Sequence, residues 1–273
     1  MRSTNAVRSL GRFARTPKGL LSGVFLVLLL VAGSLTGWTS VGPHVAAAVL
    51  GAVAADVALS RRQMTWPSSA ALSGLIVAFV LGPETPWSVT FSIGALASAS
   101  KHVLRTPRGH IFNPAALALL ASIPVFATGQ SWWGAGGDLA WPFVLLVLAT
   151  GLVVVDRINK FPLVLTFLGT YFGVFTLAAL GAPGRVAEMF RPPFVEAAIF
   201  LALFMLTDPP TSPGRYRDQV WVGILAASTA TTAQLLGLGQ AYLLLGVLVG
   251  NAGLALQRSW RFGSNWRRAQ HTA

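Results

Sequence analysis

The chain has 273 residues, of which 54% are hydrophobic and only 10% are charged, and its mean hydropathy is +0.65. Because a soluble domain of ordinary composition carries about 25% charged residues, this composition indicates an integral membrane protein, which is in contact with the lipid bilayer. The chain contains no cysteine, which excludes disulfides, cysteine-bound zinc and cysteine-bound iron–sulfur clusters.

Ten apolar stretches follow one another along the chain and predict an all-α membrane protein of about ten transmembrane helices. Five lie in the first half, near Gly19–Leu35, Val41–Leu59, Ser68–Leu81, Trp87–Ser100 and Asn113–Ala127. Five lie in the second half, near Trp141–Val155, Phe161–Leu180, Phe194–Leu206, Val220–Leu238 and Ala241–Leu256. A straight spanning helix needs about 20 apolar residues, so we expect the shorter stretches to be re-entrant or to extend into their flanks.

The basic residues lie unevenly between these stretches. Of the 20 Lys and Arg residues, all but Arg185 and Arg191 precede the first stretch or follow a stretch of even number. The positive-inside rule therefore predicts a multi-pass protein of the cell inner or plasma membrane, with both termini in the cytoplasm. The same distribution explains the net charge of +12, and no motif accompanies it that would suggest a nucleic-acid partner.

The stretches divide the chain into three segments. These are a basic cytoplasmic tail at 1–18, a single membrane domain at 19–262 and a second cytoplasmic tail at 263–273. Within the membrane domain, the outward loop Thr128–Ala140 separates a first half at about 19–127 from a second half at about 141–256. Because each half has an odd number of spans, the second half enters the membrane with the opposite orientation. We therefore expect two inverted five-helix halves with broken helices. The alternative is a ten-helix bundle without internal symmetry.

Two Pro-containing strings interrupt the apolar pattern, one in each half. His110-Ile-Phe-Asn-Pro-Ala-Ala116 follows the fourth stretch, and Thr207-Asp-Pro-Pro-Thr-Ser-Pro213 follows the eighth. Paired Pro-interrupted segments in two halves are the best sequence indication of a binding site within a membrane protein. Asn113 is expected to cap a helix that begins at Pro114, and Asp208-Pro209 permits the same interpretation. Helix starts also present free N–H groups to an anion or a carbonyl, so capping and ligand binding both account for these residues.

Few other ionisable residues lie within the stretches. Asp56 is expected to pair with Arg61 or Arg62, and Glu196 with Arg191. The histidines do not face each other in the predicted topology, which argues against a haem held by two histidines, and no metal-ligand spacing is visible. His110 could donate to a phosphate or a flavin carbonyl, or it could be a solvated loop histidine.

The strings resemble a known family. Lys101-His102, followed by Gly109-His110-Ile-Phe-Asn-Pro-Ala, resembles the RnfD/NqrB family, whose members are membrane components of ion-pumping electron-transport complexes. Phe204-Met-Leu-Thr-Asp-Pro-Pro-Thr-Ser-Pro213 resembles the second motif of that family, a run that ends in Thr-Asp-Pro-Val-Thr-Ser-Pro. Ser73-Gly-Leu-Ile and Tyr242–Asn251 are weaker matches to its third and last spans, so the resemblance covers about Ser68 to Leu256.

The resemblance implies a fold, a cofactor and a set of site residues. The fold is ten helices in two inverted halves, similar to urea transporters. The cofactor is a flavin, FMN or riboflavin, near His110, Asn113, Pro114, Thr207, Asp208 and Thr211. Members in the pumping complexes hold FMN covalently through a Thr in a Ser-Gly-Ala-Thr type motif between the two strings, and this chain has no such motif there. It therefore resembles the shorter stand-alone relatives, some of them linked to enediyne biosynthesis, and we expect a noncovalent flavin.

These observations lead to one preferred function and two alternatives. The preferred function is membrane electron transfer between a redox partner protein and a quinone or another acceptor, with ion translocation coupled to motion of one half against the other. Whether the chain is part of a flavin-dependent oxidoreductase or translocase is left open. The alternatives are a small-solute or ion transporter or channel of the same fold, and a cofactor-free accessory membrane protein, for example of a biosynthetic pathway. Fold similarity alone does not choose between them.

Overall fold

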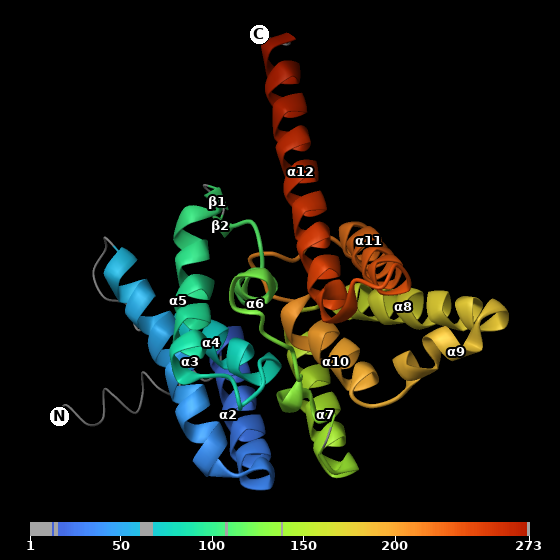
Figure 1. Ribbon diagram of the computed structural model, residues 1–273. Helices are drawn as coiled ribbons and strands as arrows, with labels where there is room; N and C mark the ends of the chain where they lie inside the picture. Colours follow the sequence, from blue (N-terminus) through green and yellow to red (C-terminus); the bar gives the residue numbers. More distant parts are fainter. Residues whose placement is uncertain (1–12, 14–15, 61–67, 107–108, 138, 272–273) are drawn as a thin grey trace.

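A computed structural model shows the chain to be almost entirely α-helical (Figure 1). It describes residues 13, 16–60, 68–106, 109–137 and 139–271. The helices before Thr128 are α2 (Pro17–Thr36), α3 (Trp38–Leu59), α4 (Ser68–Val80), α5 (Trp87–Val103) and α6 (Pro114–Phe126). Those after it are α7 (Trp141–Arg157), α8 (Phe161–Gly181), α9 (Pro183–Val186), α10 (Phe194–Phe200), α11 (Tyr216–Leu235) and α12 (Tyr242–His271).

Short elements connect these helices. The 3-10 helices are η1 (Trp133–Ala135), η2 (Ala187–Phe190) and η4 (Gly239–Ala241), and α10 continues into a π-helical segment, η3 (Leu201–Met205). In the described part of the chain, the only strands are β1 (Arg105–Thr106) and β2 (Gly109–His110). They pair antiparallel, with Arg105 opposite His110 and Thr106 opposite Gly109.

Each of the ten predicted stretches coincides with a helix, but only four helices are long and apolar enough to cross a membrane, counted over the described residues. These four are α2, α3, α8 and the segment Gly239–Trp260, which contains most of the apolar part of α12. The segments 69–80, 114–126 and 194–205 are apolar but shorter. The all-α class is therefore confirmed, whereas the count of ten transmembrane helices and the inverted repeat stay predictions.

Most helix contacts lie within the first or the second part of the chain. In the first part of the chain α3 packs against α4 and α5, and α5 against α6. In the second part α8 packs against α11, and α11 against α12. The two parts meet where α2 packs against α7 and where α6 packs against α12. In Figure 1, α2, α3, α5 and α7 run in a similar direction, and α8 lies across that direction.

Glycines allow α3 and α5 to approach closely. A Cβ at Gly51 would collide with the carbonyl oxygen of Phe91, and a Cβ at Gly94 would collide with the carbonyl oxygen of Ala48. Small residues at such positions let helix backbones come together, which is how apolar helices associate in the absence of water. The small-residue composition of these two stretches therefore determines their contact.

Aromatic rings fill the junction between the two parts of the chain. Phe25 of α2 lies 5.6 Å from Phe79 of α4 and 5.2 Å from Phe204 of η3, measured between ring centroids. Phe79 also lies 5.4 Å from Trp133 of η1 in an edge-on arrangement. Offset and edge-on ring pairs at these distances are favourable beyond the area that they bury. All four of these side chains are at most 6% exposed.

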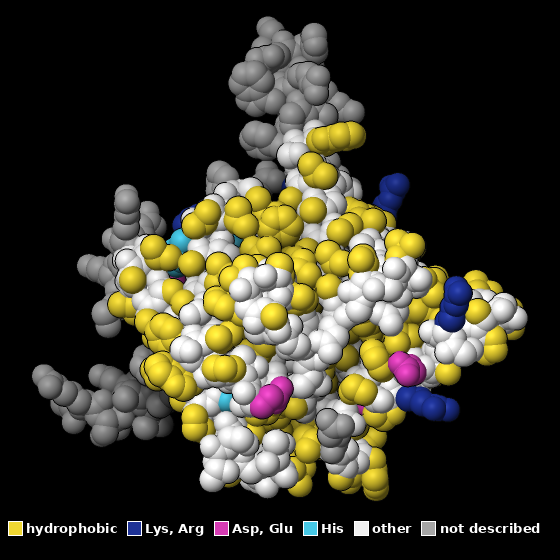
Figure 2. Space-filling view, viewed as in Figure 1, with side chains coloured by type: hydrophobic (Ala, Val, Ile, Leu, Met, Phe, Trp, Pro, Cys, Tyr) yellow, Lys and Arg dark blue, Asp and Glu magenta, His cyan; other side chains and the backbone are white. Residues whose placement is uncertain are grey.

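The outer surface of the helices carries many apolar side chains. Leu26 and Leu30 of α2 and Leu165, Leu177 and Leu180 of α8 are all more than half exposed. Figure 2 shows the same pattern on the described part of one face, where apolar side chains are many and charged groups are few. So many exposed apolar side chains indicate contact with lipid or with another protein.

Three expectations can be compared with the structure. Asp56 pairs with His102, at 2.9 Å between Oδ1 and Nε2, while Arg61 and Arg62 lie outside the described residues. Glu196 makes no ion pair in the described part of the chain; its side chain is 8% exposed and its Oε2 lacks a hydrogen-bond partner. The helix α12 continues to His271, through most of the predicted tail 263–273, whereas most of the tail 1–18 lies outside the described residues.

Candidate functional site

The first Pro-containing string forms a hairpin that leads into α6. The backbone N–H of Ile111 donates to the carbonyl oxygen of Leu104 at 3.0 Å, which closes the β1–β2 hairpin. Asn113 then caps α6, because its Oδ1 accepts a hydrogen bond from the N–H of Ala116 at 3.0 Å. Pro114 occupies the first helical position, where its missing N–H costs nothing. The capping predicted for Asn113-Pro114 is therefore confirmed.

The second string does not form the predicted helix cap. The π-helical segment ends at Met205, and the chain then stays non-helical until α11 begins at Tyr216. The carbonyl oxygen of Asp208 instead accepts from the N–H groups of Thr211 and Ser212, at 3.1 and 2.9 Å. Proline lacks an N–H and disfavours a helical conformation in the residue before it. The prolines therefore keep this string out of a helix. The interpretation of Asp208 as a helix cap is wrong for this reason.

Two buried asparagines join the strings. The backbone N–H of Asn113 donates to Oδ1 of Asn251 at 2.8 Å, and Nδ2 of Asn251 donates to the carbonyl oxygen of Thr211 at 3.1 Å. Nδ2 of Asn113 donates to the carbonyl oxygen of Met205 at 2.9 Å. Each asparagine side chain is 2% exposed. Buried polar groups are stable only when they are hydrogen-bonded, so these bonds fix the two strings relative to each other.

The side chains of the two strings also meet directly. Nε2 of His110 lies 3.4 Å from Oδ2 of Asp208, across 98 positions of sequence. The same Asp208 oxygen accepts from the hydroxyl of Thr211 at 3.2 Å, and the hydroxyl of Thr207 donates to the carbonyl oxygen of Leu203 at 2.6 Å. His110 and Asp208 are partly exposed, at 16% and 26% of their side-chain surface, so both can be reached from a cavity.

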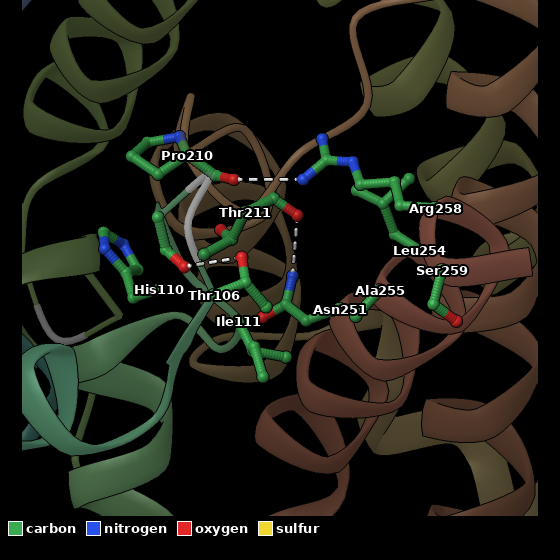
Figure 3. Close-up of a pocket in the computed structure, with 11 residues that line it drawn as sticks. Thr106, His110, Ile111, Pro210, Thr211, Asn251, Leu254, Ala255, Arg258 and Ser259 are labelled. Atoms are coloured by element: carbon green, nitrogen blue, oxygen red, sulfur yellow. Dashed lines mark hydrogen bonds between the residues drawn. The ribbon is translucent and has the colours of Figure 1, made fainter. Parts of the chain in front are cut away.

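Two adjoining cavities border these residues. One has a volume of about 400 Å³ and is lined by Lys18 and Lys101; we call it the lysine cavity. The other has a volume of about 350 Å³ and lies against α12 near Arg258; we call it the α12 cavity, and Figure 3 shows it. His110 and Pro210 line both cavities and form the wall between them. Of the six site residues predicted from the sequence, five line the lysine cavity: His110, Asn113, Pro114, Thr207 and Asp208.

The remaining residue, Thr211, lines the α12 cavity together with Asn251. The structure thus brings all six predicted residues to one or the other cavity. Of these six residues, His110 is the one that lines both cavities. The two strings therefore form one continuous region rather than two separate sites.

The lysine cavity has a polar side and an apolar side. Lys18 comes from α2 and Lys101 from the last turn of α5, and Asp208 is the acidic residue that lines the cavity with them. Nζ of Lys101 donates to the carbonyl oxygen and the hydroxyl of Ser69, at 2.7 and 3.3 Å. The apolar side is formed by residues of α4, α7 and η3 and of the turn after α7, namely Leu72, Ile76, Val154, Ile158 and Phe204. Such a cavity suits a ligand with one polar edge and one apolar edge.

Basic side chains hold the carbonyl groups of the second string. Nζ of Lys160 donates to the carbonyl oxygen of Pro213, and the guanidinium of Arg258 donates to the carbonyl oxygen of Ser212 at 3.2 Å. The side chain of Lys160 is only 6% exposed. Burial lowers the pKa of its ammonium group to about 8, and the positive charge of Arg258 acts in the same direction. These contacts keep a segment without helical hydrogen bonds in one conformation.

The sequence interpretation did not assign Lys18, Lys101, Lys160, Asn251 or Arg258 to the site. In the sequence, the basic residues indicate the side of the membrane on which they lie, and Lys101 also belongs to the first family motif. The sequence does contain an indication for Asn251, because a polar side chain within an otherwise apolar span is a candidate functional residue. In the sequence, Asn251 also ends the weak match to the last span of the family.

Comparison of the chain with protein-family models gives no match, and comparison with curated proteins gives no similar sequence. The family resemblance therefore stays a prediction, and the function is inferred from the cavities. Among the described residues, no group of three or more His, Asp and Glu side chains could hold a metal ion.

Proposed function

We propose that the chain is an integral membrane protein that binds a noncovalent flavin in the lysine cavity and transfers electrons. One observation carries the proposal: two strings from different halves of the chain meet at His110 and Asp208 and line a single cavity with both a cationic and an apolar side. Binding sites in membrane proteins of this kind form where broken helices of two halves meet.

The lining of the lysine cavity fits a flavin. Its volume of about 400 Å³ lies within the range of small-molecule sites, which is about 300–1,000 Å³. The flavin ring system has an apolar edge and an edge of carbonyl and N–H groups. The ammonium groups of Lys18 and Lys101 would donate to the carbonyl or phosphate oxygens, and the carboxylate of Asp208 would accept from the N–H. Phe204 and Leu72 would pack against the apolar part.

The chain's own residues have separate tasks in this proposal. Both polar atoms of the Asn113 side chain already have partners within the protein, so Asn113 positions the site rather than contacting the ligand. Nε2 of His110 lies 3.4 Å from Oδ2 of Asp208 at the wall of the cavity, so His110 would orient the Asp208 carboxylate toward the ligand. The side chains of α4 and η3 exclude water from the apolar side. When bound, the flavin supplies one- and two-electron transfer, which the side chains of this chain do not provide.

The proposal includes the topology predicted from the sequence. Ten spans would form two inverted halves, with both termini and both strings on the cytoplasmic side of the cell inner or plasma membrane. The exposed apolar side chains of α2 and α8 support contact with lipid. Corresponding helix contacts in the two halves support the repeat. In the first half α5 packs against α3 and α6, and in the second half α11 packs against α8 and α12. A redox partner protein and a quinone would act as donor and acceptor.

A transporter or channel is the second candidate. The lysine cavity and the α12 cavity adjoin at His110 and Pro210, so rotation of the His110 side chain would connect them. A path for a small solute or ion would need such a connection. This second function requires no cofactor.

Purification of the full chain in a mild detergent, followed by gel filtration and visible absorption, tests these proposals. A flavin spectrum that travels with the protein is the result expected for the electron-transfer function. Protein without a bound chromophore that carries solute across liposome membranes would contradict it and support the transporter. Protein with neither property would point to a cofactor-free accessory role.

A further inference from the structure

The α12 cavity lies where the membrane-length part of α12 ends. The apolar segment that is long enough to cross a membrane runs from Gly239 to Trp260, and the cavity is lined by Leu254, Ala255 and Arg258 from its last turns. The side chain of Trp260 is 79% exposed. Exposed tryptophan at the end of a membrane helix is typical of the boundary between lipid tails and headgroups. With α12 in a bilayer, the cavity opens at the depth of the headgroups.

The cavity combines an apolar floor with polar groups at its rim. Ile111 and Leu254 contribute apolar surface, and Thr106 and Ser259 contribute hydroxyl groups. Figure 3 shows Arg258 extending from α12 toward Pro210 on the far side of the cavity. Its guanidinium donates to the carbonyl oxygen of Pro210 at 3.5 Å as well as to that of Ser212. These contacts hold the guanidinium beside the cavity in a defined position.

The charge of the cavity favours an anion. Among the residues that line it, all of them described by the structure, Arg258 carries a full positive charge and none is acidic. Guanidinium groups suit phosphate because their N–H groups match its oxygens. An uncharged apolar molecule would make no hydrogen bond or ion pair with the rim, and a free anion would not cover the apolar floor. The lining therefore fits a molecule that is anionic at one end and apolar at the other.

We propose that the α12 cavity binds the headgroup of an anionic phospholipid. The phosphate would lie beside Arg258 and the hydroxyl groups of Thr106 and Ser259, and the first part of an acyl chain would lie over Ile111 and Leu254. Basic pockets at the ends of membrane helices bind headgroups of this class. The proposal requires the chain to lie in a bilayer, but it does not require a flavin.

Retention of lipid by the purified protein tests the proposal. The full chain is reconstituted into bilayers of equal parts phosphatidylglycerol and phosphatidylcholine, extracted in mild detergent, and its bound lipids are counted by native mass spectrometry. Phosphatidylglycerol should be retained about fivefold over phosphatidylcholine, the preference expected from one basic side chain near the headgroup. Arg258→Gln should bring this ratio close to one. Arg217→Gln, at an exposed arginine of α11 outside the cavity, should leave it unchanged.

A second variant separates the cavity from the charge. Ala255→Trp keeps Arg258 but fills the cavity, so it should also reduce the retained phosphatidylglycerol several-fold while the gel-filtration profile stays that of the wild type. Equal retention of the two lipids by the wild type, or an unchanged preference in Arg258→Gln, would overturn the proposal. Displacement of the lipid by excess inorganic phosphate would assign the site to free phosphate instead. A lipid preference in protein that binds no flavin would support the lipid site and contradict only the electron-transfer function.

Discussion

The backbone N–H of Asn113 donates to Oδ1 of Asn251 at 2.8 Å, although 138 positions of sequence separate the two residues. Asn251 in turn donates to the carbonyl oxygen of Thr211, so one side chain of α12 connects the start of α6 with the second Pro-containing string. Both cavities border this connection. The geometry of the candidate site therefore depends on a residue that belongs to neither string.

Replacement of Asn251 should destabilise the protein. Asn251→Leu leaves the N–H of Asn113 and the carbonyl oxygen of Thr211 buried without partners, and each unsatisfied group costs about 1–3 kcal/mol. The thermal unfolding temperature in detergent, followed by circular dichroism, should fall. Gln234→Leu is the matched control, because Oε1 of Gln234 is buried without a hydrogen-bond partner and its removal should cost nothing. Equal unfolding temperatures for Asn251→Leu and the wild type would contradict the structural role of Asn251.

Removal of the Lys101 ammonium group should weaken flavin binding. A hydrogen bond from a charged donor is worth about 1.5–3 kcal/mol, so Lys101→Met should bind riboflavin or FMN roughly tenfold or more weakly. Quenching of flavin fluorescence on titration with the purified protein measures the affinity. Arg185→Gln, at an exposed position of α9 away from both cavities, should bind flavin as the wild type does. If both variants bind equally well, the lysine cavity is not the flavin site.

Lys160 should make the stability of the protein depend on pH. Burial lowers its pKa from 10.5 to about 8 in the folded protein. Between these values the unfolded chain binds the extra proton and the folded protein does not, so this group makes the folded state more stable as pH rises from about 8 to 10.5. Below about pH 8 Lys160 is protonated in both the folded and the unfolded protein, so the buried charge destabilises the folded state in full.

Comparison with Lys160→Met isolates this effect from other titrating groups. The unfolding temperature of the wild type minus that of Lys160→Met should increase when the pH is raised from about 8 to about 10, on the basis of the lowered pKa. Differential scanning fluorimetry in detergent, with the same buffer series for both proteins, provides the measurement. A difference that stays constant over this range would show that the ammonium of Lys160 is not buried in a way that disfavours its charge.

The same substitution at two glycines should have different effects on the unfolding temperature. In Gly94→Ala, the new methyl group would collide with the carbonyl oxygen of Ala48 and force α3 and α5 apart, so the unfolding temperature should fall. In Gly169→Ala, nothing lies within 4 Å of the new methyl group, and alanine favours a helix over glycine by about 1 kcal/mol. The unfolding temperature of Gly169→Ala should therefore equal or exceed that of the wild type. A stabilising Gly94→Ala would contradict the close contact between α3 and α5.

Local features of the fold could be predicted from the sequence with good accuracy. Each apolar stretch coincides with a helix, and α6 begins at Pro114 behind the Asn113 cap. Capping depends on groups within three or four positions of each other, and helix formation depends on apolar residues in one continuous stretch. Both kinds of information are present in short segments. The prediction failed at Asp208, where the following prolines keep the chain out of a helix.

Pairings between distant residues could not be predicted in this way. The sequence offered Arg61 and Arg62, which lie outside the described residues, as partners for Asp56 because they follow it closely; it did not indicate His102, which the contact between α3 and α5 brings to Asp56. The same applies to Lys160, whose ammonium group reaches Pro213 through the packing of the second part of the chain. The sequence shows which side chains are neighbours along the backbone. The hydrogen-bond or ion-pair partner of a side chain depends also on how the helices pack.

From the sequence we could derive an apolar, helical chain with two interrupted helices and an expected site at His110, Asn113, Pro114, Thr207, Asp208 and Thr211. The packed structure was needed to show that these residues divide between two cavities with a shared wall at His110 and Pro210. It also showed that Lys101, Asn251 and Arg258 complete those cavities from α5 and α12. The difference arises because composition and local hydrogen bonding decide where helices begin and end, whereas a cavity exists only between helices that have already packed.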